Sequence, residues 1–161
     1  MLSYVVLSSF FNIYTVKGAM TYLLTIRNHT HYFGIHNVRD CLNRPDGVGL
    51  LTVSNHVTTI DSASLPSPLV HFKDLLNPHN CGYWNLARED QTHEKLYKSM
   101  ITSLVKIMPI HRGGGVHQIA LSNFIQRIKL GEWGHIFPEG RTYQVVLPLY
   151  SYSIESIKVM S

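Results

Sequence analysis

Short apolar runs, each followed by a polar or glycine-rich turn, constrain the fold of this chain more than any other feature. Runs of this length, rich in branched and aromatic residues, are typical of β-strands. The predicted strands comprise residues 25–35, 50–53, 107–110, 133–137 and 145–150. Helical segments alternate with them, so the sequence predicts an α/β fold in which a mixed β-sheet is flanked by helices.

Three segments carry helical signals. Residues 38–42 precede the turn at 43–47, which indicates a short helix. Residues 92–105 place Leu96, Met100, Ile101, Leu104 and Val105 on one side of an amphipathic helix. Residues 116–130 give a helix whose shared face holds Leu121, Phe124, Ile125 and Ile128, and Gly131 supplies its stop.

The N-terminal segment, residues 1–26, is apolar and carries Lys17 as its first charged side chain. A membrane-spanning helix needs about 20 predominantly apolar residues, and this segment is interrupted by Ser, Asn, Tyr and Thr. We therefore expect a membrane-associated helix embedded in the interface, with residues 27–161 forming the globular domain. The alternative is a helix buried in the protein core.

The charge and composition limit the partners. A net charge of +4 and a pI near 9.1 suit an anionic membrane surface or an acidic substrate. The basic residues form no stripe interleaved with aromatics, so nucleic acid is not expected as a partner. Of ten histidines, His29, His31 and His36 lie close in sequence, but no further ligands complete a metal site. We expect no metal.

The chemistry is predicted at His56 and Asp61, which follow the apolar run 50–53. A neutral imidazole can take a proton from a hydroxyl, and a carboxylate can fix its tautomer. Because there is no Ser or Cys nucleophile elbow, the pair points to acyl transfer onto an alcohol. The alternative is a capping box between Thr58 and Asp61, which would leave His56 as an ordinary turn residue.

Arg112 follows one predicted strand and precedes three glycines, residues 113–115. Glycines allow a ligand to approach the backbone, and arginine binds phosphate through two parallel hydrogen bonds. A helix beginning near Val116 would also point its N-terminus at an anion. The alternative is a glycine-rich turn with a solvated arginine.

A second turn, residues 137–140, closes the predicted strand at 133–137 and presents Glu139. A buried carboxylate at this place would bind a substrate hydroxyl or hold Arg112. Taken alone, such a turn is common at the end of a strand, and its significance comes from its order after the other two motifs.

Four sequence blocks occur in an order that resembles the glycerolipid acyltransferases. Within these, the segments 52–56, 84–115, 131–133 and 135–140 resemble the tafazzin family most closely. The blocks are Asn55-His56-x4-Asp61, Pro109-Ile110-His111-Arg112-Gly113, Phe137-Pro138-Glu139-Gly140 and Val146-Leu147-Pro148-Leu149. The resemblance implies an acyltransferase domain at residues 27–161 that moves acyl chains from phospholipid to lysophospholipid without CoA, and that remodels monolysocardiolipin to cardiolipin.

The resemblance also implies roles for individual residues. His56 would be the catalytic base and Asp61 its partner, while Arg112 would bind phosphate with Gly113. Glu139 and Gly140 would line the acceptor site. No metal or soluble cofactor is implied, and the expected location is a mitochondrial membrane facing the intermembrane space, to which the protein binds as a peripheral or monotopic protein.

The chain departs from the family after the third block, where only residues 141–144 precede the predicted strand at 145–150. A crossover between parallel neighbouring strands needs about a dozen residues. We therefore expect a C-terminally shortened domain with reduced activity. Two rivals stay open, a catalytically inactive membrane-bound relative and an acyltransferase that depends on acyl-CoA.

Overall fold

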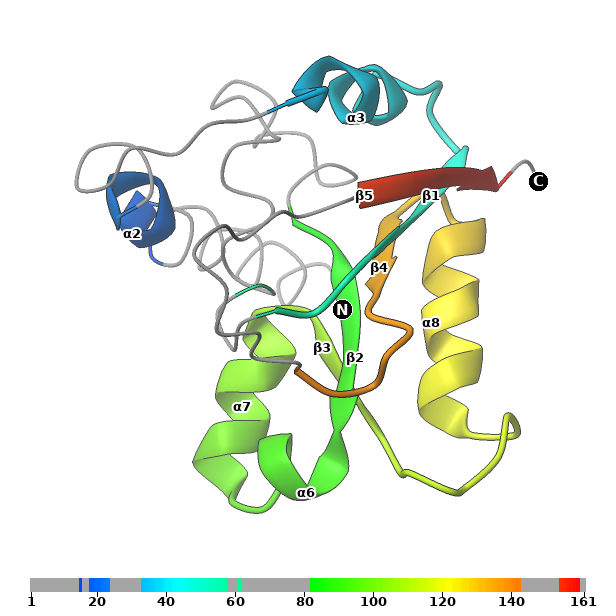
Figure 1. Cartoon of the computed structure of the whole chain (residues 1–161). Helices are drawn as coiled ribbons and strands as arrows, with labels where there is room; N and C mark the ends of the chain where they lie inside the picture. Colours follow the sequence, from blue (N-terminus) through cyan, green and yellow to red (C-terminus); the bar gives the residue numbers. More distant parts are fainter. Residues whose placement is uncertain are drawn as a thin grey trace.

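The structure is a computed structural model that describes residues 15, 18–23, 33–57, 61, 82–142 and 154–159 (Figure 1). In chain order the elements are α2 (Gly18–Thr21), α3 (Ile35–Leu42), β1 (Gly49–Ser54), β2 (Trp84–Arg88), α6 (Glu89–Thr92), α7 (Leu96–Leu104), β3 (Ile107–Ile110), α8 (Ile119–Lys129), β4 (Trp133–Ile136) and β5 (Ile154–Val159).

The five strands form one mixed sheet in the order β3-β2-β4-β1-β5. The first four are parallel, with Thr52 of β1 opposite His135 of β4, and β5 runs antiparallel along the outer side of β1. Helices α7 and α8 lie on opposite sides of this sheet (Figure 1). The predicted α/β class, a mixed sheet flanked by helices, is confirmed.

Helix α8 covers one face of the sheet. Its buried Phe124 and Ile128 pack with Trp84 of β2. Gly134 of β4 lies directly beneath them, and a Cβ at that position would come within 2.8 Å of both side chains. The absence of a side chain at residue 134 therefore lets the helix lie close against the strands.

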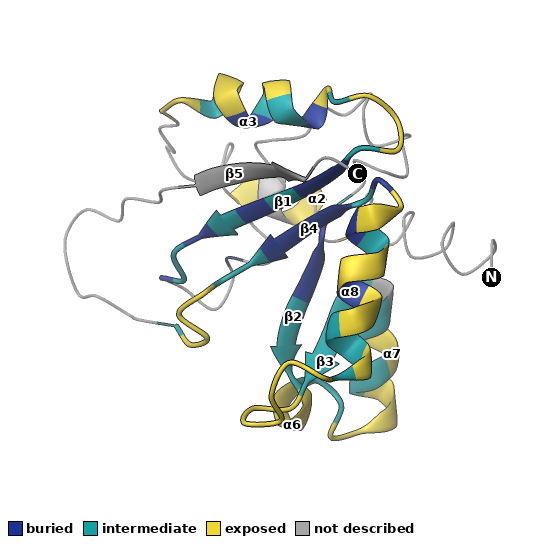
Figure 2. Ribbon diagram, turned by 90° about the vertical axis from the view of Figure 1, so that its right-hand side faces the viewer, coloured by how far each residue is buried: buried dark blue, intermediate teal, exposed yellow. Residues whose placement is uncertain are grey.

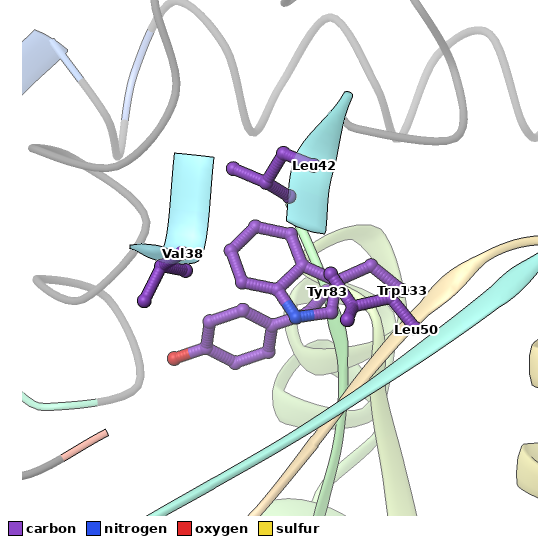
Figure 3. Close-up of a cluster of buried hydrophobic side chains, with 5 residues drawn as sticks. All are labelled: Val38, Leu42, Leu50, Tyr83 and Trp133. Atoms are coloured by element: carbon purple, nitrogen blue, oxygen red, sulfur yellow. The ribbon is translucent and has the colours of Figure 1, made fainter. Parts of the chain in front are cut away.

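Helix α3 covers part of the other face, over the buried cluster shown in Figure 3. This cluster consists of Val38, Leu42, Leu50, Tyr83 and Trp133. Successive strand residues point to opposite faces, so Leu50 belongs to this cluster whereas Leu51 packs on the α8 side. Figure 2 shows the resulting run of buried residues along β1 and β4.

The predicted elements at 38–42, 50–53, 107–110 and 133–137 correspond to α3, β1, β3 and β4. The strand predicted at 25–35 is wrong at its end, because Gly34 takes a left-handed conformation with φ 66° and Ile35 begins α3. Residues 24–32 lie outside the described part. Strand β2 was not predicted.

Helix α7 begins at Leu96, later than the predicted start at residue 92, and α6 is a separate short helix. The predicted apolar side is largely solvent-facing, since Leu96 is 80% exposed, Met100 61% and Ile101 50%. Its neighbour β3 is the edge strand of the sheet. The helix therefore has less sheet surface to cover than α8 has.

The two ends of the chain bear on the remaining predictions. The strand predicted at 145–150 lies outside the described residues, and β5 is antiparallel to β1, so the requirement for a parallel crossover does not apply to β5. Within residues 1–26, the described part contains α2. None of the helices in the described part of the chain is both long and apolar enough to cross a bilayer. Most of residues 1–26 lie outside the described part, so the interfacial helix expected there stays a prediction.

Candidate active site

The predicted site residues gather at one edge of the sheet. His56 follows β1, Arg112 follows β3, and Glu139 and Gly140 follow β4. Because these strands are parallel, their carboxyl ends meet at the same edge, which is where ligands bind in open α/β sheets.

His56 and Asp61 form a hydrogen-bonded pair. The His56 Nδ1 atom lies 3.0 Å from Oδ2 of Asp61, whose side chain is fully buried, whereas the His56 side chain is 18% exposed. Asp61 Oδ2 also accepts a 2.8 Å hydrogen bond from the Val57 backbone N–H. The carboxylate therefore holds the Val57 backbone and orients the imidazole. The alternative capping box involves Thr58, which lies outside the described residues.

The carboxylate sets the tautomer of His56. A proton on Nδ1 is directed at Asp61, which leaves the Nε2 lone pair for a hydroxyl. The Thr142 hydroxyl lies 3.2 Å from Nε2, in the direction from which an acceptor hydroxyl would approach. The imidazole also stacks on Phe137, with ring centroids 4.2 Å apart and planes 20° apart.

A buried polar layer lies beside this pair and was not predicted. Its centre is His135 of β4, which contacts the hydroxyls of Thr52 at 2.7 Å and Ser54 at 3.1 Å. The pKa of His135 is lowered to about 3, chiefly by burial and to a lesser extent by His56, while Asp61 acts in the opposite direction. The imidazole of His135 is therefore neutral at physiological pH.

Tyr83 closes this layer from the side of the α3 cluster. Its ring centroid lies 4.7 Å from that of His135. Complete burial, together with the negative charge of Asp61, raises the pKa of the Tyr83 phenol well above its usual value. Tyr83 is therefore an uncharged wall of the site.

Arg112 is exposed and lines a pocket of about 350 Å³ at the carboxyl ends of β2 and β3. The other lining residues are Arg88, Glu89, Asp90, Ile110 and His111. Arg88 is engaged by the Asp90 carboxylate through two hydrogen bonds. Of the two arginines that line this pocket, Arg88 is the one that binds the Asp90 carboxylate, and Arg112 makes no hydrogen bond to Asp90.

The glycine-rich turn after Arg112 is closed by Gln118. Its side-chain Oε1 accepts the His111 backbone N–H at 2.8 Å, and its Nε2 donates to the Gly115 carbonyl at 2.8 Å. Helix α8 begins at Ile119. The prediction of a helix N-terminus near Val116 is therefore wrong by three residues, because the glutamine side chain organises this stretch as a loop.

Glu139 is exposed, which contradicts the predicted buried carboxylate. In the described part of the chain no ion pair joins it to Arg112. Instead Gly140, at φ 64°, faces that arginine, and a Cβ there would lie 3.7 Å from Nη2 of Arg112. The turn after β4 thus reaches both Arg112, through Gly140, and His56, through Thr142.

The sequence matches the family model described as Acyltransferase over residues 34–148. It is 34% identical over 139 residues to the N-acylphosphatidylethanolamine synthase of Arabidopsis thaliana, covering 83% of this chain and 48% of that relative. Tafazzin of Drosophila melanogaster is 35% identical over 98 residues, covering 61% of this chain and 25% of its own length.

Taffazin of Dictyostelium discoideum is 33% identical over 109 residues, which cover 68% of this chain and 36% of that protein. The chain therefore spans about half or less of the length of these relatives. No solved structure matches it significantly. The matches confirm the resemblance drawn from the four sequence blocks, and because the family match covers most of the chain, this protein belongs to the acyltransferase family.

Proposed function

We propose that this chain transfers an acyl group from a phospholipid to the free hydroxyl of a lysophospholipid, without CoA. The observation that carries the proposal is the imidazole of His56. Its Nδ1 is held by the buried Asp61 carboxylate, and its Nε2 is in hydrogen-bond reach of a hydroxyl. This arrangement suits a general base acting directly on an alcohol.

The proposed reaction begins when His56 Nε2 removes the proton from the acceptor hydroxyl. The acceptor oxygen forms a bond to the carbonyl carbon of the donor ester, and the ester bond to the donor glycerol oxygen then breaks. The proton on Nε2 passes to that leaving oxygen, which completes a new lysophospholipid. Asp61 stabilises the intervening imidazolium and is not itself protonated.

Arg112 and Gly140 form the proposed headgroup site. The Arg112 guanidinium lies near Gly140, so a phosphate bound on that side of it would rest between the turns after β3 and β4. We propose monolysocardiolipin as the acceptor lysolipid, in a mitochondrial membrane facing the intermembrane space. Residues 1–26 would provide the membrane contact. Two relatives named as tafazzins support this choice.

A second candidate acceptor is the amine of phosphatidylethanolamine. It is favoured by the similarity to an N-acylphosphatidylethanolamine synthase, which covers 83% of this chain. The same base would remove a proton from the amine, and the product would be an amide instead of an ester.

The test is a transfer assay with radiolabelled phosphatidylcholine as donor in mixed vesicles. Monolysocardiolipin and phosphatidylethanolamine are supplied as acceptors, separately and in competition, with and without CoA. We expect labelled cardiolipin without CoA, and none from His56→Ala. Labelled amide in place of ester would identify the second candidate.

Two further arms address the rivals. Acyl-CoA is offered as donor in the presence of a thiol reagent, and release of CoA that requires His56 would identify an acyl-CoA-dependent enzyme. A folded chain that transfers label from neither donor is a catalytically inactive family member, and this outcome would refute the proposal.

A further inference from the structure

The polar layer beside His56 is a directed chain of hydrogen bonds. The indole N–H of Trp133 donates to Thr52 Oγ1 at 2.8 Å, and Thr52 Oγ1 lies 2.7 Å from His135 Nδ1. On the other side of the ring, His135 Nε2 lies 3.1 Å from Ser54 Oγ. Ser54 Oγ lies 3.1 Å from the Asn55 carbonyl.

The direction of this chain depends on which acceptor receives the Thr52 proton. An indole nitrogen can only donate, so Thr52 accepts from Trp133 and has one proton left to give. Its two available acceptors are His135 Nδ1 at 2.7 Å and the Gly134 carbonyl at 3.4 Å. The shorter contact is the better hydrogen bond. With that proton on the shorter contact, His135 accepts at Nδ1 and donates from Nε2 to Ser54, which in turn donates to Asn55. With it on the Gly134 carbonyl instead, Thr52 would accept from His135 Nδ1–H through its second lone pair.

Two contacts connect this chain of hydrogen bonds to His56. The chain ends on the carbonyl of Asn55, which belongs to the peptide bond that leads into His56. The ring of His135 also meets the edge of Phe137, with centroids 4.6 Å apart and planes at 74°. Phe137 is the ring on which His56 stacks. His135 thus supports both the backbone before His56 and the surface beneath its imidazole.

We infer that His135 is a positioning residue for the acyl transfer, which as a neutral Nε2–H tautomer fixes the orientation of His56 through Ser54 and Phe137. This inference rests on the proposed function for its catalytic consequence. A phenylalanine at 135 would fill similar space but could neither accept from Thr52 nor donate to Ser54.

The surroundings of His135 keep it neutral. The ionisable groups that act on it are His56 and Asp61, the Tyr83 ring packs against it, and residue 135 itself is 1% exposed. Helix α3 contributes apolar side chains and Cys41 to the cluster behind Tyr83. A second proton on His135 would reverse its contact with Thr52, whose own proton would turn to the longer Gly134 contact, and would place a positive charge beside His56.

The first experiment reads the tautomer directly and needs no activity. In the full chain with ¹⁵N-labelled histidine, two-bond ¹H–¹⁵N spectra are recorded from pH 5 to 8, and His135 is assigned by comparison with His135→Phe. We expect a proton on Nε2, none on Nδ1, and no change across this range. A proton on Nδ1, or uptake of a second proton above pH 5, would overturn the inference.

The second experiment measures positioning. Thr52→Val interrupts the chain while leaving His135 in place, and Thr102→Val is the matched control because it removes a partly buried hydroxyl on α7. We expect His135→Phe to lower kcat about tenfold or more with KM nearly unchanged, since misplacement of a catalytic group costs rate. Thr52→Val should act in the same direction and Thr102→Val should not.

The NMR signal of the His56 ring separates a failed inference from a failed function. It should shift or broaden in Thr52→Val and not in Thr102→Val, whether or not transfer is detected. If wild-type chain transfers nothing while this signal responds, the proposed function fails and the positioning contact stands. If kcat per folded molecule and the His56 signal are both unchanged in Thr52→Val and His135→Phe, the residue is only structural and the inference is overturned.

Discussion

The imidazole of His56 lies nearly flat on the phenyl ring of Phe137, with ring centroids 4.2 Å apart. The two residues are far apart in sequence, and they meet because β1 and β4 are parallel neighbours whose carboxyl ends coincide. The first and third sequence blocks are thereby combined into one site. The ring also limits rotation of the imidazole, so that its orientation is set by Asp61 on the edge and Phe137 on the face.

Loss of the imidazole should abolish transfer while the fold is kept. A general base contributes about 10² to 10⁴ in rate, so His56→Ala should lose about that factor in kcat/KM. Asp61→Asn should be damaged nearly as badly, because the amide no longer stabilises the imidazolium. Transfer kinetics and circular dichroism together check this. If Asp61 served only as a helix cap, its removal would cost about 1 kcal/mol of stability and leave the activity per folded molecule intact.

The Thr142 hydroxyl marks the place of the acceptor hydroxyl. It hydrogen-bonds to His56 Nε2, as a substrate would, and direct transfer requires that it give way. We therefore expect Thr142→Val to keep kcat within about threefold of the wild type, a change below about 1 kcal/mol in activation free energy. The same steady-state assay gives the answer. A loss above a hundredfold that Thr142→Ser restores would instead identify Thr142 as a covalent nucleophile.

Arg112 should serve the substrate more than the fold, because its side chain is exposed and lines a pocket. Arg112→Lys retains the charge and loses the two parallel donors of the guanidinium. The apparent KM for the lysolipid should rise and the melting temperature should not change. Arg112→Ala should raise KM further. Unchanged kinetics in Arg112→Lys would support the alternative of a solvated turn arginine.

The His56–Asp61 pair could be predicted because both residues belong to one turn, so their contact depends on local chain geometry alone. The role of His135 could not. Alternation along the strand places Thr52 and Ser54 on one face, but the register that sets His135 opposite Thr52 comes from strand pairing. No feature of the sequence displays that register.

The remaining differences also have tertiary causes. Strand β2 was not predicted because Asn85 and Arg88 interrupt its apolar run. It forms a strand in the middle of the sheet because it pairs with β3 on one side and β4 on the other. Helical spacing correctly predicted that α7 is a helix. It could not predict that the apolar side of α7 is largely exposed, because that depends on how much of the sheet lies beneath the helix. The buried carboxylate considered for Glu139 is not found, because the chain has already left the sheet at that residue and the side chain is exposed.

At the amino end of β4, away from the candidate site, Glu132 contributes to the stability of the sheet. Its carboxylate accepts hydrogen bonds from the Trp84 indole and from Arg127, and the buried Lys106 ammonium lies 3.8 Å away. Glu132→Gln should destabilise the protein by about 1–3 kcal/mol, because a buried cation loses its countercharge. Chemical denaturation measures this. The control is Glu94→Gln, which breaks an exposed pair with Lys98 and should cost less than about 1 kcal/mol.

Protonation of His135 should link stability to pH. An imidazole in the unfolded chain has a pKa of about 6.5, whereas burial lowers the pKa of His135 in the folded protein to about 3. Between these values the unfolded state binds a proton that the folded state refuses. This group therefore lowers stability as the pH falls from about 6.5 toward 3, and it has no such effect above about 6.5.

The expected size follows from the same linkage. Each pH unit within this window costs about 1.4 kcal/mol, so the wild type should lose about 2 kcal/mol from this group between pH 7 and pH 5. His135→Phe removes the titrating group while leaving the other acids and histidines in place. Urea denaturation of both proteins at pH 7, 6 and 5 should show their stabilities converging as the pH falls. A constant difference would mean that His135 is protonated equally in the folded and unfolded states.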